Sequence, residues 1–287
     1  MSASRIKQGE RMILVTGATG TIGRHLVRAL AETGAPFRAL VRDAARGREL
    51  GCDFVVADLD EPASMAAALK GVDRLLLNSG GALPVAGQQP MVRQQTTAID
   101  AARAAGVSQV VKVSAWRPRP DAKLSVRAHW QIEQLLKASS LQWAMLQPTG
   151  YMQNFFTGEG GFTHSGALAG PYGAGRVAYI DAYDVAACAV VLLTGSLGIS
   201  KSYALTGPQA LAHEEIAAKL GVPFRDLSPR KAAEKLRAQG LPGWFVGDLL
   251  WLYADMAADG MSQVTTTVRD LIGRAPRTFD EFLAANG

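Results

Sequence analysis

Short apolar runs alternate with amphipathic segments along the first half of the chain. Residues 12–16 are almost wholly apolar, and 21–33 carry apolar side chains at helical spacing up to Gly34. Unbroken apolar runs are typical of strands buried on both faces, whereas spacings of three and four residues are typical of a helix packed on one face. The pattern then repeats. It predicts strands at 12–16, 36–42, 53–57, 72–77, 107–113 and 141–146, and helices at 21–33, 62–70, 90–105 and 125–138.

This alternation predicts an α/β fold: a Rossmann-type doubly wound parallel sheet with a small mixed C-terminal substrate-binding part. Parallel strands need crossover connections, and the intervening helices supply them. We expect a polar tail at 1–11 and a NAD(P)-binding core at 12–150. Residues 151–287 follow without a Pro- or Ser-rich linker, so we expect them to be intertwined with the core. They predict a glycine-rich loop at 158–175, a strand at 202–205, and helices at 182–194, 212–220 and 229–239.

Composition and charge exclude several classes of protein. Of the 287 residues, 48% are hydrophobic and 19% charged, which is typical of a globular enzyme or binding protein. No apolar run is long enough to span a membrane and the N-terminus lacks an apolar signal region, so we expect no membrane partner and a cytoplasmic location. The net charge is +5, but Lys and Arg are scattered, so nucleic acid is not expected as a partner. Cys52 and Cys188 stand apart from any His cluster, which predicts neither a disulfide nor a metal site. For the oligomeric state, the sequence is compatible with a monomer and with a homodimer.

A glycine-rich turn, VTGATGTIGRHLV at 15–27, joins the first strand to the first helix. Gly17 permits a tight turn, Gly20 lets the backbone approach a pyrophosphate, and Gly23 lets helix and strand pack closely. Backbone N–H groups and the positive end of the helix dipole then face the anion. A glycine turn that serves packing alone is the alternative. The dinucleotide site predicted here also includes Thr19, Thr21 and Ile22.

The end of the second strand indicates which dinucleotide binds. An acidic residue there hydrogen-bonds the ribose of NAD, whereas an arginine accommodates the 2'-phosphate of NADP. The sequence places Arg42 and Asp43 side by side, with Arg46 nearby. The two cations favour NADP, with NAD as the less favoured alternative, and we expect Asp43 to cap the following turn.

Two further strand ends complete the predicted cofactor site. The third strand closes with Asp58, Leu59 and Asp60. The Asp58 carboxylate can accept a hydrogen bond from an adenine amine, while capping of the next helix is an equal alternative for Asp60. Small polar residues close the fourth strand and permit close backbone approach to the cofactor. They are Asn78, Ser79 and Gly80.

These segments give the chain a resemblance to a known family. The motifs VTGATGTIGRHLV, LVRDAARG, ADLDEPASMAAALKGVD and LLLNSGG, in this order, resemble the NmrA-like family of atypical short-chain dehydrogenases/reductases. The resemblance covers about residues 12–285. Within the family, the chain is similar to NADPH-dependent quinone oxidoreductases of type 2, triphenylmethane and azo dye reductases, and festuclavine-dehydrogenase-like proteins. The resemblance implies a Rossmann core, an NADP(H) ligand and a small C-terminal substrate region.

The Tyr-x-x-x-Lys pair of ordinary short-chain dehydrogenases does not occur in the sequence. Ser114, at the end of the fifth strand, matches the usual catalytic serine position by context. The helix expected to carry the pair carries His129 and Glu133 instead, four residues apart on one helical face, where the carboxylate can set the imidazole tautomer. His129 then holds the nicotinamide ribose or donates a proton. Stabilisation of the helix by the pair is an equal alternative.

By the same resemblance, the segment after the sixth strand passes beside the nicotinamide. Pro148, Thr149 and Gly150 match the backbone that contacts it. Open α/β sheets bind ligands at the carboxyl ends of their strands, although aromatic residues in such positions also serve as core. The residues expected to line the substrate space are Trp116, Tyr151, Asn154 and Phe155.

Together these features predict an NADPH-dependent oxidoreductase that passes hydride to a conjugated small-molecule acceptor, such as a quinone, a dye or an iminium. Hydride transfer of this kind depends more on orientation than on a strong acid, so the missing tyrosine does not exclude an enzyme. The alternative is an NADP-binding redox sensor that regulates a partner without turnover, as some members of the family do.

Overall fold

A parallel sheet forms the centre of the computed structural model, which describes residues 11–157, 163–164, 166–196 and 199–286. Within these residues the sheet has seven strands in the order β10-β6-β5-β4-β1-β2-β3, so the Rossmann-type fold is confirmed. The strands are β1 (Ile13–Val15), β2 (Phe37–Val41), β3 (Phe54–Val56), β4 (Arg74–Leu77), β5 (Gln109–Val113), β6 (Gln142–Pro148) and β10 (Lys201–Leu205).

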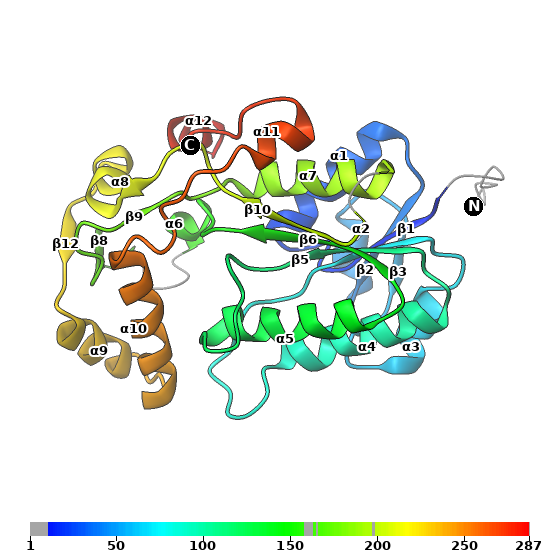
Figure 1. Cartoon of the computed structure of the whole chain (residues 1–287), viewed down its shortest axis with the longest axis horizontal. Coiled ribbons are helices and arrows are strands. Elements are labelled where there is room, and N and C mark those ends of the chain that lie inside the picture. The colour runs from blue at the N-terminus through cyan, green and yellow to red at the C-terminus, as the bar shows by residue number, and fades with distance from the viewer. Residues whose placement is uncertain (1–10, 158–162, 165, 197–198, 287) are drawn as a thin grey trace.

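Helices cover both faces of this sheet, as Figure 1 shows. Ile13 and Val15 of β1 belong to one apolar core, while Leu14 between them belongs to the other. Because successive strand residues point to opposite faces, a strand buried on both sides is apolar at most positions. One face packs against α1 (Thr21–Thr33), α7 (Ala182–Thr194) and α11 (Thr267–Ile272). The other packs against α3 (Pro62–Ala68), α4 (Pro90–Ala104) and α5 (Leu124–Ala138).

The second half of the chain contributes to these layers and also builds a smaller lobe. β10 pairs with β6, and α7 packs on α1. The lobe lies beyond the carboxyl end of β6 and has its own apolar core (Figure 1). Its strands are β7 (Thr163–His164), β8 (Ala167–Gly170), β9 (Arg176–Val177), β11 (Leu211–Ala212) and β12 (Phe224–Asp226). Its helices are α6 (Asn154–Thr157), α8 (His213–Leu220), α9 (Pro229–Ala238), α10 (Gly243–Ala257) and α12 (Phe279–Asn286).

The predicted strands and helices are present, with ends shifted by at most about two residues. The structure differs from the prediction in one expected loop and in several helices that were not predicted. The loop expected at 158–175 contains β7 and β8, so that prediction was wrong for its described part. The sequence patterns did not predict α2 (Ala44–Arg48) or α10 to α12. In α10, apolar residues fill nearly every position, so no polar stripe marks the helical period.

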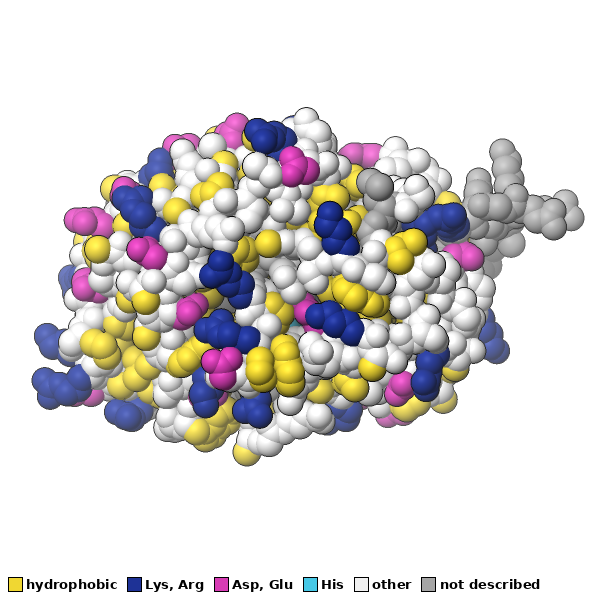
Figure 2. Space-filling model, viewed as in Figure 1, with side chains coloured by type: hydrophobic (Ala, Val, Ile, Leu, Met, Phe, Trp, Pro, Cys, Tyr) yellow, Lys and Arg dark blue, Asp and Glu magenta, His cyan; other side chains and the backbone are white. Residues whose placement is uncertain are grey.

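The surface agrees with the scattered charge of the sequence. On the face in Figure 2, Lys and Arg are interspersed with Asp and Glu. Across the described ranges, no helix combines the length and apolar character needed to cross a membrane.

Candidate active site

The glycine turn has the geometry that its sequence predicts. Gly17 has a φ of 66°, the left-handed region that favours glycine. A Cβ at Gly23 would overlap the carbonyl oxygen of Gly17, so the helix can pack this closely only without a side chain. Among the described residues no side chain caps α1, and its first turn contains no acidic residue. Its free N–H groups and positive dipole end can therefore receive an anion.

A cavity of about 250 Å³ begins at this turn. It is bordered by the exposed Arg42 at the end of β2. Asp43 caps α2 by accepting a 2.8 Å hydrogen bond from the backbone N–H of Ala45, as predicted. Arg46, within α2, is not among the lining residues. The predicted cofactor residues that line this cavity are Gly17, Arg42, Asp58, Leu59, Asn78, Ser79 and Gly80.

Asp58 and Asp60 have different partners. Asp58 Oδ1 accepts a 3.0 Å hydrogen bond from the backbone N–H of Asp60. Asp60 itself accepts from Arg93 and Gln94 of α4, each at 2.8 Å. Glu61 occupies the N-cap position of α3, so the capping role considered for Asp60 was wrong.

A second cavity, of about 460 Å³, continues from the first and shares residues 78–81 with it. It crosses the carboxyl ends of β4, β5 and β6, where ligands bind in open α/β sheets. Helix α10 closes its far side with Leu249, Leu252, Tyr253 and Met256. The predicted residues that line it are Thr21, Ile22, Asn78, Ser79, Gly80, Ser114, Trp116, His129, Pro148, Thr149, Gly150, Tyr151 and Asn154. The predicted residues that line neither cavity are Thr19, Gly20, Gly23 and Phe155.

Phe155 was predicted to line the substrate space, and this prediction was wrong. Its side chain is 3% exposed and packs edge-on against Tyr179 and Phe279, with ring centroids 4.9 and 5.6 Å away. It is therefore part of the core of the small lobe. Asn154 and Phe155 are consecutive in α6, so they point in directions about 100° apart, and only Asn154 faces the cavity.

The predicted contact between His129 and Glu133 is also corrected. Glu133 is buried, and its Oε1 accepts hydrogen bonds from Ser114 Oγ at 2.6 Å and Gln147 Nε2 at 2.8 Å. Its other oxygen contacts Lys137 Nζ at 3.3 Å. His129 Nδ1 instead lies 2.9 Å from the ammonium nitrogen of Lys112. The helical spacing is as expected, but both side chains bond to residues outside α5: His129 to Lys112 of β5, and Glu133 to Ser114 after that strand.

Lys112 is a candidate functional residue that the sequence patterns did not single out. It lies inside β5 with no solvent exposure, although strand interiors rarely hold a lysine. Burial lowers the pKa of Lys112 to about 7, partly opposed by the Glu133 carboxylate. Burial and then the charge of Lys112 lower the pKa of His129 well below its usual value, so its ring is neutral at pH 7. The sequence signal was available, because a single cation interrupts the apolar run QVVKV.

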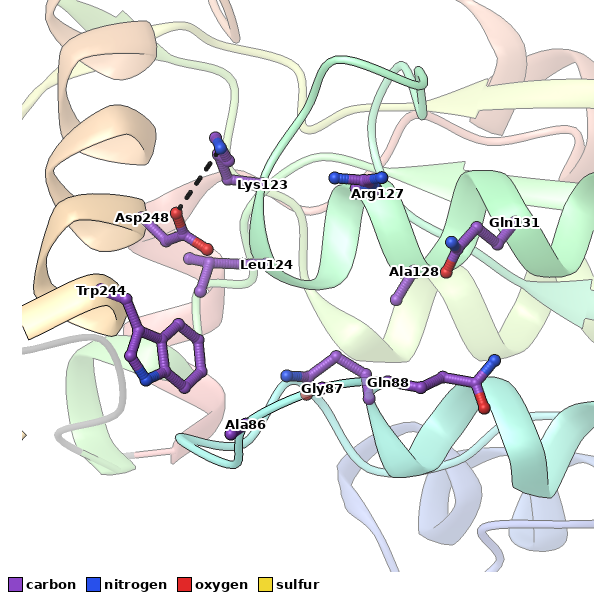
Figure 3. Close-up of a pocket in the computed structure, with 11 residues that line it drawn as sticks. Ala86, Gly87, Gln88, Lys123, Leu124, Arg127, Ala128, Gln131, Trp244 and Asp248 are labelled. Atoms are coloured by element: carbon purple, nitrogen blue, oxygen red, sulfur yellow. Dashed lines mark ion pairs between the residues drawn. The ribbon is translucent and has the colours of Figure 1, made fainter. Parts of the chain in front are cut away.

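A third cavity, of about 560 Å³, is lined by α5 and α10, and other residues of the same two helices line the second cavity. Figure 3 shows Trp244 and Asp248 of α10 facing Leu124 and Arg127 of α5 across it. Lys123 Nζ lies 4.0 Å from Asp248 Oδ1 at the rim.

Comparison with known proteins identifies the group to which this fold and site belong. Residues 9–221 match the NmrA-like family. The chain belongs to this family. This NmrA-like protein is 37% identical over 286 residues to NAD(P)H azoreductase of Xenophilus azovorans, covering 96% of this chain and 98% of that one. The expected family is thus confirmed.

Two further relatives match over almost their whole length. One is the (4-alkanoyl-5-oxo-2,5-dihydrofuran-3-yl)methyl phosphate reductase of Streptomyces griseus subsp. griseus, 33% identical, with 95% of this chain and 97% of the relative covered. The other is a crystal structure of the Escherichia coli NADPH-dependent quinone oxidoreductase complexed with NADPH. It superposes with a TM-score of 0.82 at 27% identity and covers 96% and 99% of the two chains. Relatives of this NmrA-like protein thus include NAD(P)H-dependent reductases.

Proposed function

We propose that this NmrA-like protein is an NADPH-dependent oxidoreductase that transfers hydride to a conjugated small-molecule acceptor, such as a quinone, an azo or other dye, or an iminium. The observation that carries the proposal is one continuous pair of cavities. They run from the glycine turn and Arg42 to an end bordered by Trp116, Tyr151 and His129. The relatives named above, an azoreductase and a quinone oxidoreductase, support the same reaction class.

The residues present fit a phosphorylated dinucleotide. A Cβ at Gly17 would stand 3.0 Å from the carbonyl oxygen of Asn78, so the turn keeps its shape only with glycine there. Gly20 is exposed beside the uncapped first turn of α1, which leaves its backbone open to a pyrophosphate. Arg42 would hold the 2'-phosphate, and this charge favours NADPH over NADH. When bound, NADPH supplies the hydride.

The rest of the groove orients the acceptor and excludes water from it. Trp116 Nε1 donates a 2.9 Å hydrogen bond to the carbonyl oxygen of Gly260, which fixes the indole as a rigid wall. Burial raises the pKa of Tyr151, so its phenol stays protonated and does not act as a base. We propose that His129 is the polar group nearest the reacting atoms and that residues 151–287 provide the substrate-binding part. The third cavity would receive the outer part of a long acceptor.

The test is a screen of purified protein with NADPH against quinones, azo and triphenylmethane dyes, and cyclic iminium ions. We expect steady oxidation of NADPH with at least one of these classes. Replacing Trp116→Phe should lower kcat/KM for that acceptor and leave the Kd for NADPH unchanged, because the indole contacts only the acceptor end. Trp143→Phe, remote from the cavities, is the matched control. Tight NADPH binding without turnover across the panel would instead support the redox-sensor alternative.

A further inference from the structure

We propose that Lys112 is a positioning residue that holds His129 with its proton on Nε2 and replenishes that proton when His129 gives it to the reduced acceptor. This inference deepens the proposed reductase function and rests on it. The predicted strand 107–113 includes Lys112, but neither a role for this lysine nor its pairing with His129 was expected from the sequence.

The hydrogen bonds of Lys112 fix the imidazole tautomer. Lys112 Nζ donates to the carbonyl oxygen of Val113 at 3.0 Å and lies 2.9 Å from His129 Nδ1. A protonated lysine has donors and no acceptor, so Nδ1 must be the acceptor in this contact. The single proton of a neutral imidazole is then on Nε2. His129 is therefore a hydrogen-bond donor at the ring nitrogen opposite Lys112.

That nitrogen is available to a ligand. His129 lines the second cavity, whereas Lys112 does not. In the part of the chain that the structure describes, no hydrogen bond to His129 Nε2 is formed. Lys112 can therefore reach an acceptor only through the ring of His129.

The surroundings of Lys112 bring its pKa close to neutral pH. Glu133 of α5 is the carboxylate that favours its charged form, and this carboxylate is shared with Ser114, Gln147 and Lys137. On the neighbouring strands, the residues in register with Lys112 are the apolar Leu77 of β4 and Met145 of β6. Burial against partial charge compensation gives the lysine a pKa of about 7, so it can release and regain a proton near neutral pH.

The proton transfer balances without a further reagent. A quinone or azo acceptor that has gained hydride carries a negative charge on oxygen or nitrogen, whereas an iminium ion or a cationic dye becomes neutral and needs no proton. The Nε2–H bond of His129 breaks and its proton joins that atom, while Nδ1 takes a proton from Lys112 Nζ. The ring ends neutral with its proton on Nδ1, and Lys112 ends as an amine. Water in the cavity then protonates Nε2, and Nδ1 returns its proton to Lys112 Nζ, which restores the starting state. No electrons are transferred in this step.

Nitrogen-15 NMR of the protein without cofactor tests the tautomer. The sequence contains 4 histidines, and loss of one pair of ring signals in His129→Gln assigns His129. We expect a protonated Nε2 and an unprotonated Nδ1, with a pH-dependent shift centred near 7 as Lys112 titrates. Lys112→Met should produce a mixture of tautomers, whereas Lys137→Met should not. A protonated Nδ1 in the unmodified protein, or an unchanged tautomer in Lys112→Met, would overturn the inference.

Kinetics tests the proton supply. With a quinone or azo acceptor found in the screen, Lys112→Met should lower kcat by about 100-fold, the usual contribution of a positioned acid, without changing the Kd for NADPH. The unmodified protein should lose kcat above about pH 7, and Lys112→Met should lack that limb. Wild-type kcat and pH dependence in Lys112→Met would refute the proton supply. If the unmodified protein reduces no acceptor, both the proposed function and the proton supply are refuted. The NMR result is independent of turnover and still tests the tautomer.

Discussion

Ser114 Oγ donates a 2.6 Å hydrogen bond to Oε1 of Glu133, and both side chains are buried. Ser114 therefore holds the carboxylate that faces Lys112, in addition to lining the second cavity. We expect Ser114→Ala to reduce the free energy of unfolding by about 1–3 kcal/mol, because it leaves a buried acceptor with one donor fewer. Denaturant titration measures this. In a Glu133→Gln background the loss should be smaller, and an equal loss in both backgrounds would contradict the coupling.

Arg42 should determine the preference between the two nicotinamide dinucleotides. We expect Arg42→Ala to raise the Kd for NADPH roughly 10- to 100-fold, the equivalent of one charge-assisted hydrogen bond, while the Kd for NADH stays unchanged. Arg46→Ala is the matched control, because this arginine does not line the cavity. Fluorescence titration with both cofactors measures the effect. Equal NADPH and NADH affinities in the unmodified protein would refute the assignment.

Gly23 and Gly20 should respond differently to the same substitution. In Gly23→Ala the new Cβ overlaps the backbone of Gly17 and Ala18, and we expect a loss of stability of about 1–3 kcal/mol or more. In Gly20→Ala the Cβ would stand 3.3 Å from the carbonyl oxygen of Gly17, so the protein should fold but bind NADPH more weakly. Thermal melting and NADPH titration separate the two effects. A stable Gly23→Ala protein would show that close packing is not the role of this glycine.

Lys112 should make stability depend on pH. Its pKa of about 7 in the folded protein lies below the value of 10.5 for an exposed lysine, so the unfolded chain binds more protons between these values. Stability attributable to this site therefore rises with pH across that window and is lowest below it. We expect Lys112→Met to raise the melting temperature most at pH 6 to 7, with the advantage shrinking toward about pH 10. A constant difference across this range would mean that Lys112 does not titrate with a lowered pKa.

Trp244 should affect long acceptors more than short ones. It is 44% exposed and lines the third cavity, so its removal should cost little stability. We expect Trp244→Ala to raise KM for extended dyes roughly tenfold, because about 1–2 kcal/mol of apolar contact is lost, and to leave KM for small quinones unchanged. Phe156→Ala, which removes another exposed aromatic outside all three cavities, is the control. Equal effects on short and long acceptors would contradict this use of the cavity.

The sequence alone determined the parallel sheet, the glycine turn and the position of Arg42 beside it. These features depend on local rules, since a strand buried on both faces is apolar at most positions, and a left-handed turn favours glycine. Their signals are complete within about thirty residues, the length of one strand–helix–strand unit.

Only the tertiary structure decided which polar groups pair and which aromatic side chain faces the groove. His129 and Glu133 are spaced to meet on α5, yet Lys112 of β5 and Ser114, directly after that strand, take them as separate partners. Phe155 likewise turns into the lobe because Phe279, far along the chain, completes a core there. These pairings depend on contacts between segments that are distant in sequence. Helical spacing therefore indicated which side chains could pair, but not which pairs form.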